Sequence, residues 1–216
     1  MNKSKPRVPK ERIQGATAQN RLGLERLVFF SDAVFAIAIT LLVLDIRLPS
    51  GADLADNHQL LLLLAGLWHK YLAYFLSFWV IGLSWISHHR KFLHIQRVDN
   101  PLLFLNLLML MMIAFIPFPT AVVSENTNFT ATAFYALIMT LACLSGLILW
   151  WYATRHHKLI DPHLDQHQIW REALVPVATI AIFVFSIGVA VFYPGLARIC
   201  WLLVFPVSLF LRRKAA

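Results

Sequence analysis

The residue best placed to do chemistry in this sequence is Asp32, which follows Ser31 inside a long apolar run. An ionisable side chain one turn into a membrane helix is costly to bury, and it indicates a partner on another helix. Arg26 lies six residues earlier, roughly 240° around a helix, so it is not expected to pair with Asp32 along one face. A buried polar clamp that holds helices together and a direct role in transport both fit these residues. The candidate partners are Ser31, Trp85, His88 and Asn106.

The same run carries an aliphatic stripe. Ile37, Leu41 and Leu44 project within about 60° of one another on a helix, and Thr40 lies beside them. Copies of this helix around a symmetry axis would stack rings of branched side chains with a hydroxyl ring between them. Such rings gate a pore by excluding water, and a narrow ring also discriminates among ions. An ordinary packing stripe is the competing interpretation.

Histidines form a second group of chemically versatile residues. Those predicted in two loops are His88, His89 and His94, and then His156, His157, His163 and His167. His163 and His167 are spaced to share a helical face, but no cysteine or glutamate completes a zinc-like ligand set. We interpret them as solvated or pH-sensing side chains and expect no bound metal. The sequence shows no nucleophile with a base at suitable spacing and no phosphate-binding glycine loop, so we expect no enzyme activity and no cofactor.

The elements that position these residues are membrane helices. Hydrophobic residues make up 59% of the 216 and charged residues only 14%, whereas a soluble domain has about 25% charged residues. Apolar runs of about 20 residues, the length that crosses a bilayer, separate the charged clusters. The formal charge of +8 is interpreted as a membrane-orientation signal and not as a nucleic-acid interface.

The runs predict an all-α integral membrane protein with six spans. A basic tail (1–26) precedes the membrane domain (27–212), and a basic end (213–216) follows it. A short helix at about 53–68 is too polar at its start to span and is expected at the outer interface. Pro117 and Pro119 are expected to kink or end the third span. The predicted spans are 27–46, 71–87, 101–123, 130–152, 173–192 and 196–211.

The distribution of basic residues predicts the orientation. With these spans, 16 of the 19 lysines and arginines fall on one side, and only Arg47, Lys70 and Arg198 fall on the other. Because basic loops stay in the cytoplasm, both termini are predicted to be cytoplasmic.

The first span resembles the signature of the transmembrane protein 175 family, the endosomal and lysosomal potassium channels. The resemblance rests on an R-x-x-x-F-S-D string from Arg26 to Asp32, followed by A-V-F-A-I-A-I-T-L-L-V-L-D-I. The six-span layout and the element from Trp85 to His88 extend it over most of the chain. Animal members contain two six-span repeats, so this chain resembles the prokaryotic form, which implies a homotetramer in a prokaryotic plasma membrane.

The resemblance implies a pore lined by the first helix of each subunit and permeated by K⁺. Ile37 would form the constriction, with further rings at Leu41 and Leu44, and Thr40 would assist potassium selectivity. Bacterial members often have leucine at the constriction, so Ile37 resembles the animal form. The family lacks the carbonyl filter of ordinary potassium channels, and no T-V-G-Y-G string occurs here. The implied network that holds the pore helix consists of Arg26, Ser31, Asp32, Trp85, His88 and Asn106.

The sequence therefore predicts a passive, potassium-selective channel. The alternative is a secondary transporter that uses Asp32 as a coupling carboxylate. Transporters place such groups near the bilayer midplane, whereas Asp32 is predicted near the cytoplasmic end of its helix, which disfavours the alternative.

Overall fold

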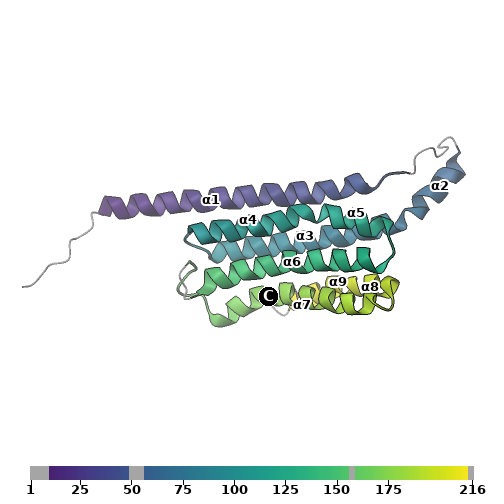
Figure 1. Ribbon diagram of the computed structural model, residues 1–216. Helices are drawn as coiled ribbons and strands as arrows, with labels where there is room; N and C mark the ends of the chain where they lie inside the picture. Colours follow the sequence, from purple (N-terminus) through teal and green to yellow (C-terminus); the bar gives the residue numbers. More distant parts are fainter. Residues whose placement is uncertain (1–9, 49–55, 156–158, 214–216) are drawn as a thin grey trace, which may run out of the picture.

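The computed structural model describes residues 10–48, 56–155 and 159–213, with side chains from Asn20 onward, and this part of the chain is a helical bundle (Figure 1). Six of its helical segments are long and apolar enough to cross a membrane, the predicted number. The helices are α1 (Lys10–Leu41) with a short 3-10 extension η1 (Leu42–Asp45), α2 (Asn57–Gly66), α3 (Trp68–His94), α4 (Asn100–Phe115), α5 (Pro117–Glu125), α6 (Phe129–Thr154), α7 (Gln166–Ala190), α8 (Pro194–Trp201) and α9 (Val204–Arg213).

Several helices extend beyond the predicted spans on the basic side. Helix α1 begins at Lys10, inside the predicted basic tail, and α3 continues to His94 instead of ending at residue 87. The prediction that His88, His89 and His94 lie in a loop was therefore wrong. Hydropathy falls where a helix leaves the membrane, but lysine, arginine and glutamine are good helix formers, so the backbone hydrogen bonds continue.

Prolines interrupt two of the spans. The third span divides at Ile116 into α4 and α5, directly before Pro117, which confirms the predicted kink. The last span divides at Leu202 and Leu203 into α8 and α9. Pro206 follows this break, and its ring opposes helical hydrogen bonding to the carbonyl of residue 202. In contrast, α7 continues through Pro176.

Helix α2 is the described part of the short helix predicted at about 53–68, of which residues 53–55 lie outside the described ranges. Asp56 caps it by accepting a hydrogen bond from the backbone N–H of His58 at 3.0 Å. None of its residues is buried, and it projects from one end of the bundle (Figure 1).

Hydrogen bonds close the bundle at that end. Lys70 Nζ lies 3.1 Å from Glu125 Oε1 and 3.3 Å from the carbonyl oxygen of Asp45. Ser124 Oγ donates to Asp45 Oδ2 at 3.1 Å. Arg198 of α8 donates to the carbonyl oxygen of Asn126. These contacts place Lys70 and Arg198, two of the three basic residues predicted on the side opposite the basic loops, at this end of the bundle.

The opposite end joins the α3–α4 connection to the α6–α7 connection. Backbone N–H groups of Gln96 and Asp161 donate to the carbonyls of Leu159 and His94 at 2.8 and 3.0 Å. Tyr152 donates its hydroxyl to Asp99 Oδ2 at 2.7 Å. Helix α1 lies along α3, α4 and α5 at one edge of the bundle, and α7, α8 and α9 form the other edge (Figure 1).

Candidate functional site

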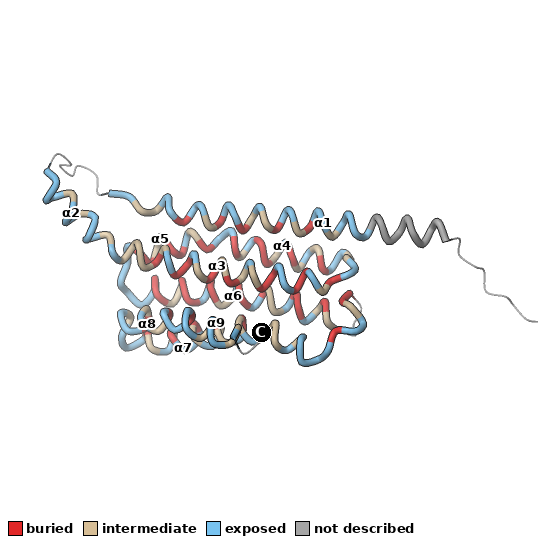
Figure 2. Tube along the Cα trace, turned by 180° about the vertical axis from the view of Figure 1, so that it is seen from behind, coloured by how far each residue is buried: buried red, intermediate tan, exposed pale blue. Residues whose placement is uncertain are grey.

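One face of α1 packs on the bundle. Its fully buried side chains recur every three or four residues, which is the spacing of one helical face. They are Leu27, Ser31, Phe35 and Ala38, and Leu42 at the start of η1 continues the face. From Asn20 onward, the remaining residues of α1 are exposed or half-buried (Figure 2). A single contact face therefore anchors the helix that carries the predicted site.

A chain of buried polar groups joins α1 to α4 and α3. Ser31 Oγ donates to the carbonyl oxygen of Leu27 at 2.8 Å and accepts from Asn106 Nδ2 at 2.9 Å. Asn106 Oδ1 lies 2.9 Å from His88 Nε2. Ser31 and Asn106 are completely buried, and His88 is 3% exposed. Since an unpaired polar group is costly in an apolar interior, this chain pins the rotation of α1 about its own axis.

These hydrogen bonds also determine which atoms of Asn106 and His88 carry the bonding protons. Because Asn106 uses its amide N–H for Ser31, its carbonyl oxygen faces His88, and His88 Nε2 is the donor. The imidazole stacks on Phe92 with ring centroids 4.2 Å apart and contacts the Phe35 ring at 5.6 Å. His88 Nδ1 is buried without a hydrogen-bond partner in the described part of the chain.

Asp32 has a separate partner. Trp85 Nε1 donates to Asp32 Oδ1 at 2.8 Å, one turn of α3 before His88. Asp32 is half-buried, and Trp85 is 39% exposed. Arg26 is exposed and makes no hydrogen bond or ion pair with the described residues, so its place in the network stays a prediction for the assembled protein.

The predicted pore-lining stripe faces away from the bundle. Ile37, Leu41 and Leu44 are 58%, 42% and 57% exposed. Thr40 is exposed beside them, and its hydroxyl donates to the carbonyl oxygen of Ile37 at 2.9 Å. This proton direction leaves the lone pairs of the Thr40 oxygen free to face a cation. Within one subunit the stripe is thus not a packing contact between its own helices.

The predicted histidine groups do not come together. His163 precedes α7, whereas His167 lies in the first turn of α7, so the pair does not share a helical face. His156 and His157 lie outside the described residues. Within the described ranges, no three histidine, cysteine, aspartate or glutamate side chains form a group able to hold a metal ion.

Lys91 is the residue that the sequence prediction misplaced most. It follows the predicted second span (71–87), yet it lies in the last turn of α3 and is 3% exposed. Its Nζ donates to the carbonyl oxygen of Gly146 on α6 at 3.2 Å. Extending the helix through residue 94 would have placed Lys91 on the face of Ser84 and Ser87, but no sequence signal marks a backbone carbonyl as its partner.

Comparison with known proteins places the chain among described channels. The family described as "Endosomal/lysosomal potassium channel TMEM175" matches residues 26–117. A protein of Streptomyces collinus named as a potassium channel is 46% identical over 152 residues, covering 65% of this chain and 69% of the relative. Bovine TMEM175, named as an endosomal/lysosomal proton channel, is 42% identical over 101 residues, covering 44% of this chain and 21% of the relative.

A solved structure is similar over nearly the whole bundle. The crystal structure of a lysosomal potassium-selective channel TMEM175 homolog from Chamaesiphon minutus matches with a TM-score of 0.74 and 29% sequence identity. The match covers 88% of this chain and 98% of that one. The similarity therefore extends beyond the first helices to the arrangement of the bundle.

The buried hydrogen bonds that join Ser31, Asn106 and His88 lead to a prediction about stability. Asn106→Leu leaves the N–H of His88 without an acceptor, at a cost of about 1–3 kcal/mol, and we expect Tm to fall by about 5 °C. Trp85→Phe removes one hydrogen bond at a partly exposed site, so we expect a fall of only about 2 °C. Thermal unfolding of the purified variants in one detergent, followed by circular dichroism, measures both shifts. Equal shifts in Tm would mean that burial does not determine how much each of these hydrogen bonds contributes to stability.

Proposed function

Because the chain belongs to the family of the endosomal/lysosomal potassium channel TMEM175, we propose that it conducts K⁺ passively through a pore lined by α1. The family is one of ion channels, so the chain is not an enzyme. Its six apolar segments make it a multi-pass membrane protein. The observation that carries the pore assignment is the open aliphatic stripe on the helix whose other face is anchored by buried hydrogen bonds.

The stripe supports a homotetramer in which the α1 helices surround an axis. Ile37 forms the constriction, and Leu41 and Leu44 add rings toward the outer mouth. Branched side chains in a narrow ring exclude water, so ions cross only when the ring widens or when they shed part of their hydration shell. The Ser31–Asn106–His88 chain and the Asp32–Trp85 bond hold the rotation of α1 that points these side chains inward.

Thr40 supplies the polar ring of the pore. Its hydroxyl proton points to the Ile37 carbonyl, so its oxygen presents lone pairs to the axis. A ring of such oxygens replaces part of the hydration of K⁺ beside an otherwise apolar wall. This geometry supports a selectivity role for Thr40.

The orientation follows from the charge distribution. The protein lies in the plasma membrane of a prokaryote. The end of the bundle near Arg97, Arg155 and Arg171 faces the cytoplasm, and both termini lie on that side. Lys70, Arg198, Asp45 and Glu125 lie outside. Basic residues near span ends are retained on the cytoplasmic side of a membrane.

Two other activities are distinguishable from this one. A secondary transporter would use Asp32 as a coupling group, but its carboxylate accepts a hydrogen bond from Trp85. Proton conduction is the second candidate, because the bovine relative is named a proton channel. A water-excluding constriction passes protons only along a transient file of water molecules. Proton flux and potassium flux therefore report different states of the Ile37 ring.

We expect liposomes that contain the purified protein to release K⁺ down its gradient alone. Potassium-selective electrodes report the efflux, and a pH-sensitive dye reports proton entry, each compared with protein-free liposomes. Efflux in the absence of any proton or sodium gradient supports the channel. A requirement for either gradient would support the transporter, and proton entry without potassium efflux would support proton conduction.

Ile37→Asn is expected to raise basal potassium flux about tenfold, the factor that corresponds to about 1.4 kcal/mol of barrier. The amide holds water in the constriction, and K⁺ then crosses without losing its hydration shell. Single-channel or liposome flux measurements test this, with Ile39→Asn as a control on a half-buried position of the same helix. Unchanged flux in the Ile37 variant would remove this residue from the constriction.

Thr40→Ala is expected to lower the preference for K⁺ over Na⁺ several-fold while leaving the protein open to both. Removal of the hydroxyl ring takes away oxygens that replace water around K⁺. Reversal potentials in mixed potassium and sodium solutions measure the ratio, and Thr40→Ser, which keeps the hydroxyl, should retain it. Identical reversal potentials in the alanine variant would exclude a selectivity role.

A further inference from the structure

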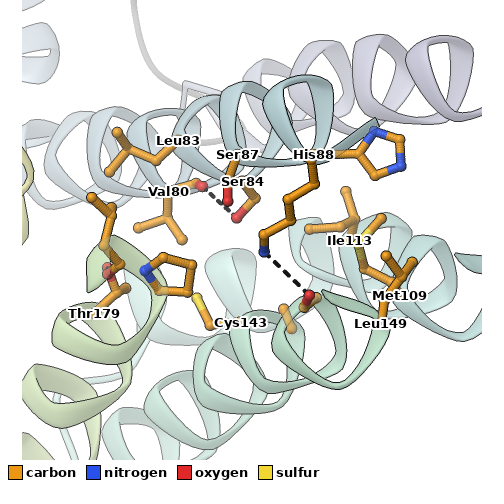
Figure 3. Close-up of a pocket in the computed structure, with 15 residues that line it drawn as sticks. Val80, Leu83, Ser84, Ser87, His88, Met109, Ile113, Cys143, Leu149 and Thr179 are labelled. Carbon is orange, nitrogen blue, oxygen red and sulfur yellow. Dashed lines mark hydrogen bonds between the residues drawn. The ribbon is translucent and has the colours of Figure 1, made fainter. Parts of the chain in front are cut away.

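Each subunit contains a cavity away from α1, bounded by α3, α4, α6 and α7. Figure 3 shows Ser84 and Ser87 of α3 on one side, with Cys143 and Thr179 on the other. Most of the wall is apolar, including Val80, Ile113 and Leu149. The volume of the cavity that the centres of water-sized molecules can occupy is about 30 Å³. Since one water needs about 10–15 Å³, the cavity holds a small ion with a water molecule but not a lipid headgroup.

Two side chains of the cavity, Lys91 and Ser87, have donors without partners among the described residues, and the unpartnered Nδ1 of His88 is an acceptor. Lys91 Nζ has three N–H donors, and only one is directed to Gly146. The hydroxyl of Ser87 is buried and has no hydrogen-bond partner in the described part of the chain. By contrast, the hydroxyls of Ser84 and Thr179 donate to the backbone carbonyls of Val80 and Val175. The unused donors therefore come from Lys91 and Ser87.

Lys91 forms no ion pair with a described carboxylate. The only ion pairs among the described residues are Arg21–Glu25 and Lys70–Glu125, so no carboxylate lies within 4.0 Å of Lys91 Nζ. A buried ammonium group without an opposite charge is strongly disfavoured. The surrounding titratable groups are His88 on α3, Cys143 on α6 and Glu172 on α7. Glu172 is the only acid among them, and it lines a neighbouring cavity instead.

That neighbouring cavity forms a cationic mouth. It shares Ser87 and Val175 with the first one and is lined by Arg90, Arg171 and Arg212 together with Glu172. Three guanidinium groups against one carboxylate leave the mouth positive. Arg212 Nε is buried without a hydrogen-bond partner among the described residues. A positively charged cleft raises the local concentration of anions.

We propose that the cavity binds a small inorganic anion, of the size and charge of chloride, with Lys91 Nζ and Ser87 Oγ as its donors. The anion enters from the arginine-lined mouth and neutralises the buried ammonium group. The site lies within one subunit and is separate from the proposed pore. Its test therefore does not depend on which helix lines the conduction path.

Bromide is the probe for the site, because it replaces chloride and scatters X-rays anomalously. We expect crystals of the full chain grown with KBr to show an anomalous peak within hydrogen-bond distance of Lys91 Nζ. The peak should be absent in Lys91→Met, weaker in Ser87→Ala, and unchanged in Ser84→Ala, whose hydroxyl is already bonded to Val80. A wild-type cavity that contains water alone would overturn the proposal, as would a bromide peak that survives in Lys91→Met.

Thermal unfolding gives an independent readout. When gluconate is replaced by saturating chloride at constant potassium, we expect Tm of the wild type to rise by about 5 °C, because binding to the folded state stabilises it. Lys91→Met should lose this rise, and Ser84→Ala should keep it. If Lys91→Met does not fold, the wild-type peak and the Ser87→Ala response decide. A wild type insensitive to chloride, with sensitivity appearing only in Glu172→Gln, would identify Glu172 as the counter-charge and overturn the anion site.

Discussion

The amide side chain of Asn106 is the contact on which the position of α1 depends. It is completely buried and joins Ser31 of α1 to His88 of α3 through two hydrogen bonds of 2.9 Å. Apolar contacts alone leave a membrane helix free to rotate and slide, because lipid chains offer a similar environment. Hydrogen bonds are directional, so these donors and acceptors are all satisfied at only one rotation and height of α1. Rotation of α1 by one residue, about 100°, would break the hydrogen bond between Ser31 and Asn106.

This constraint separates the two faces of α1. Ser31, Phe35 and Ala38 lie against the bundle, which leaves Ile37, Leu41 and Leu44 on open surface. In a lone subunit those side chains would have only lipid or detergent as neighbours. In the proposed tetramer, the same rotation directs them to the axis and brings Thr40 with them. The anchor and the proposed constriction therefore depend on one helical register.

The sequence predicted the spans and the main anchoring residues because membrane physics makes those signals strong. Ser31 and Asn106 lie inside predicted spans and His88 directly follows one, and the three side chains are joined by hydrogen bonds. Helix ends were less predictable, since α1 and α3 continue past the hydropathy boundary to Lys10 and His94. The burial of Lys91 could not be predicted, because its partner is the backbone carbonyl of Gly146, which any residue would supply.

Helix α3 brings the anchor and the proposed anion site within one turn of each other. His88 bonds toward Asn106 and α1, whereas the preceding residue, Ser87, lies in the cavity with Lys91. Consecutive residues point about 100° apart on a helix, so one turn of α3 serves both sites. A charge bound at Lys91 alters the electrostatic environment of that turn, and any shift of the turn moves the acceptor geometry at Asn106. The anchor of α1 and the proposed anion site therefore depend on the same turn of α3, and a displacement of that turn would reach both.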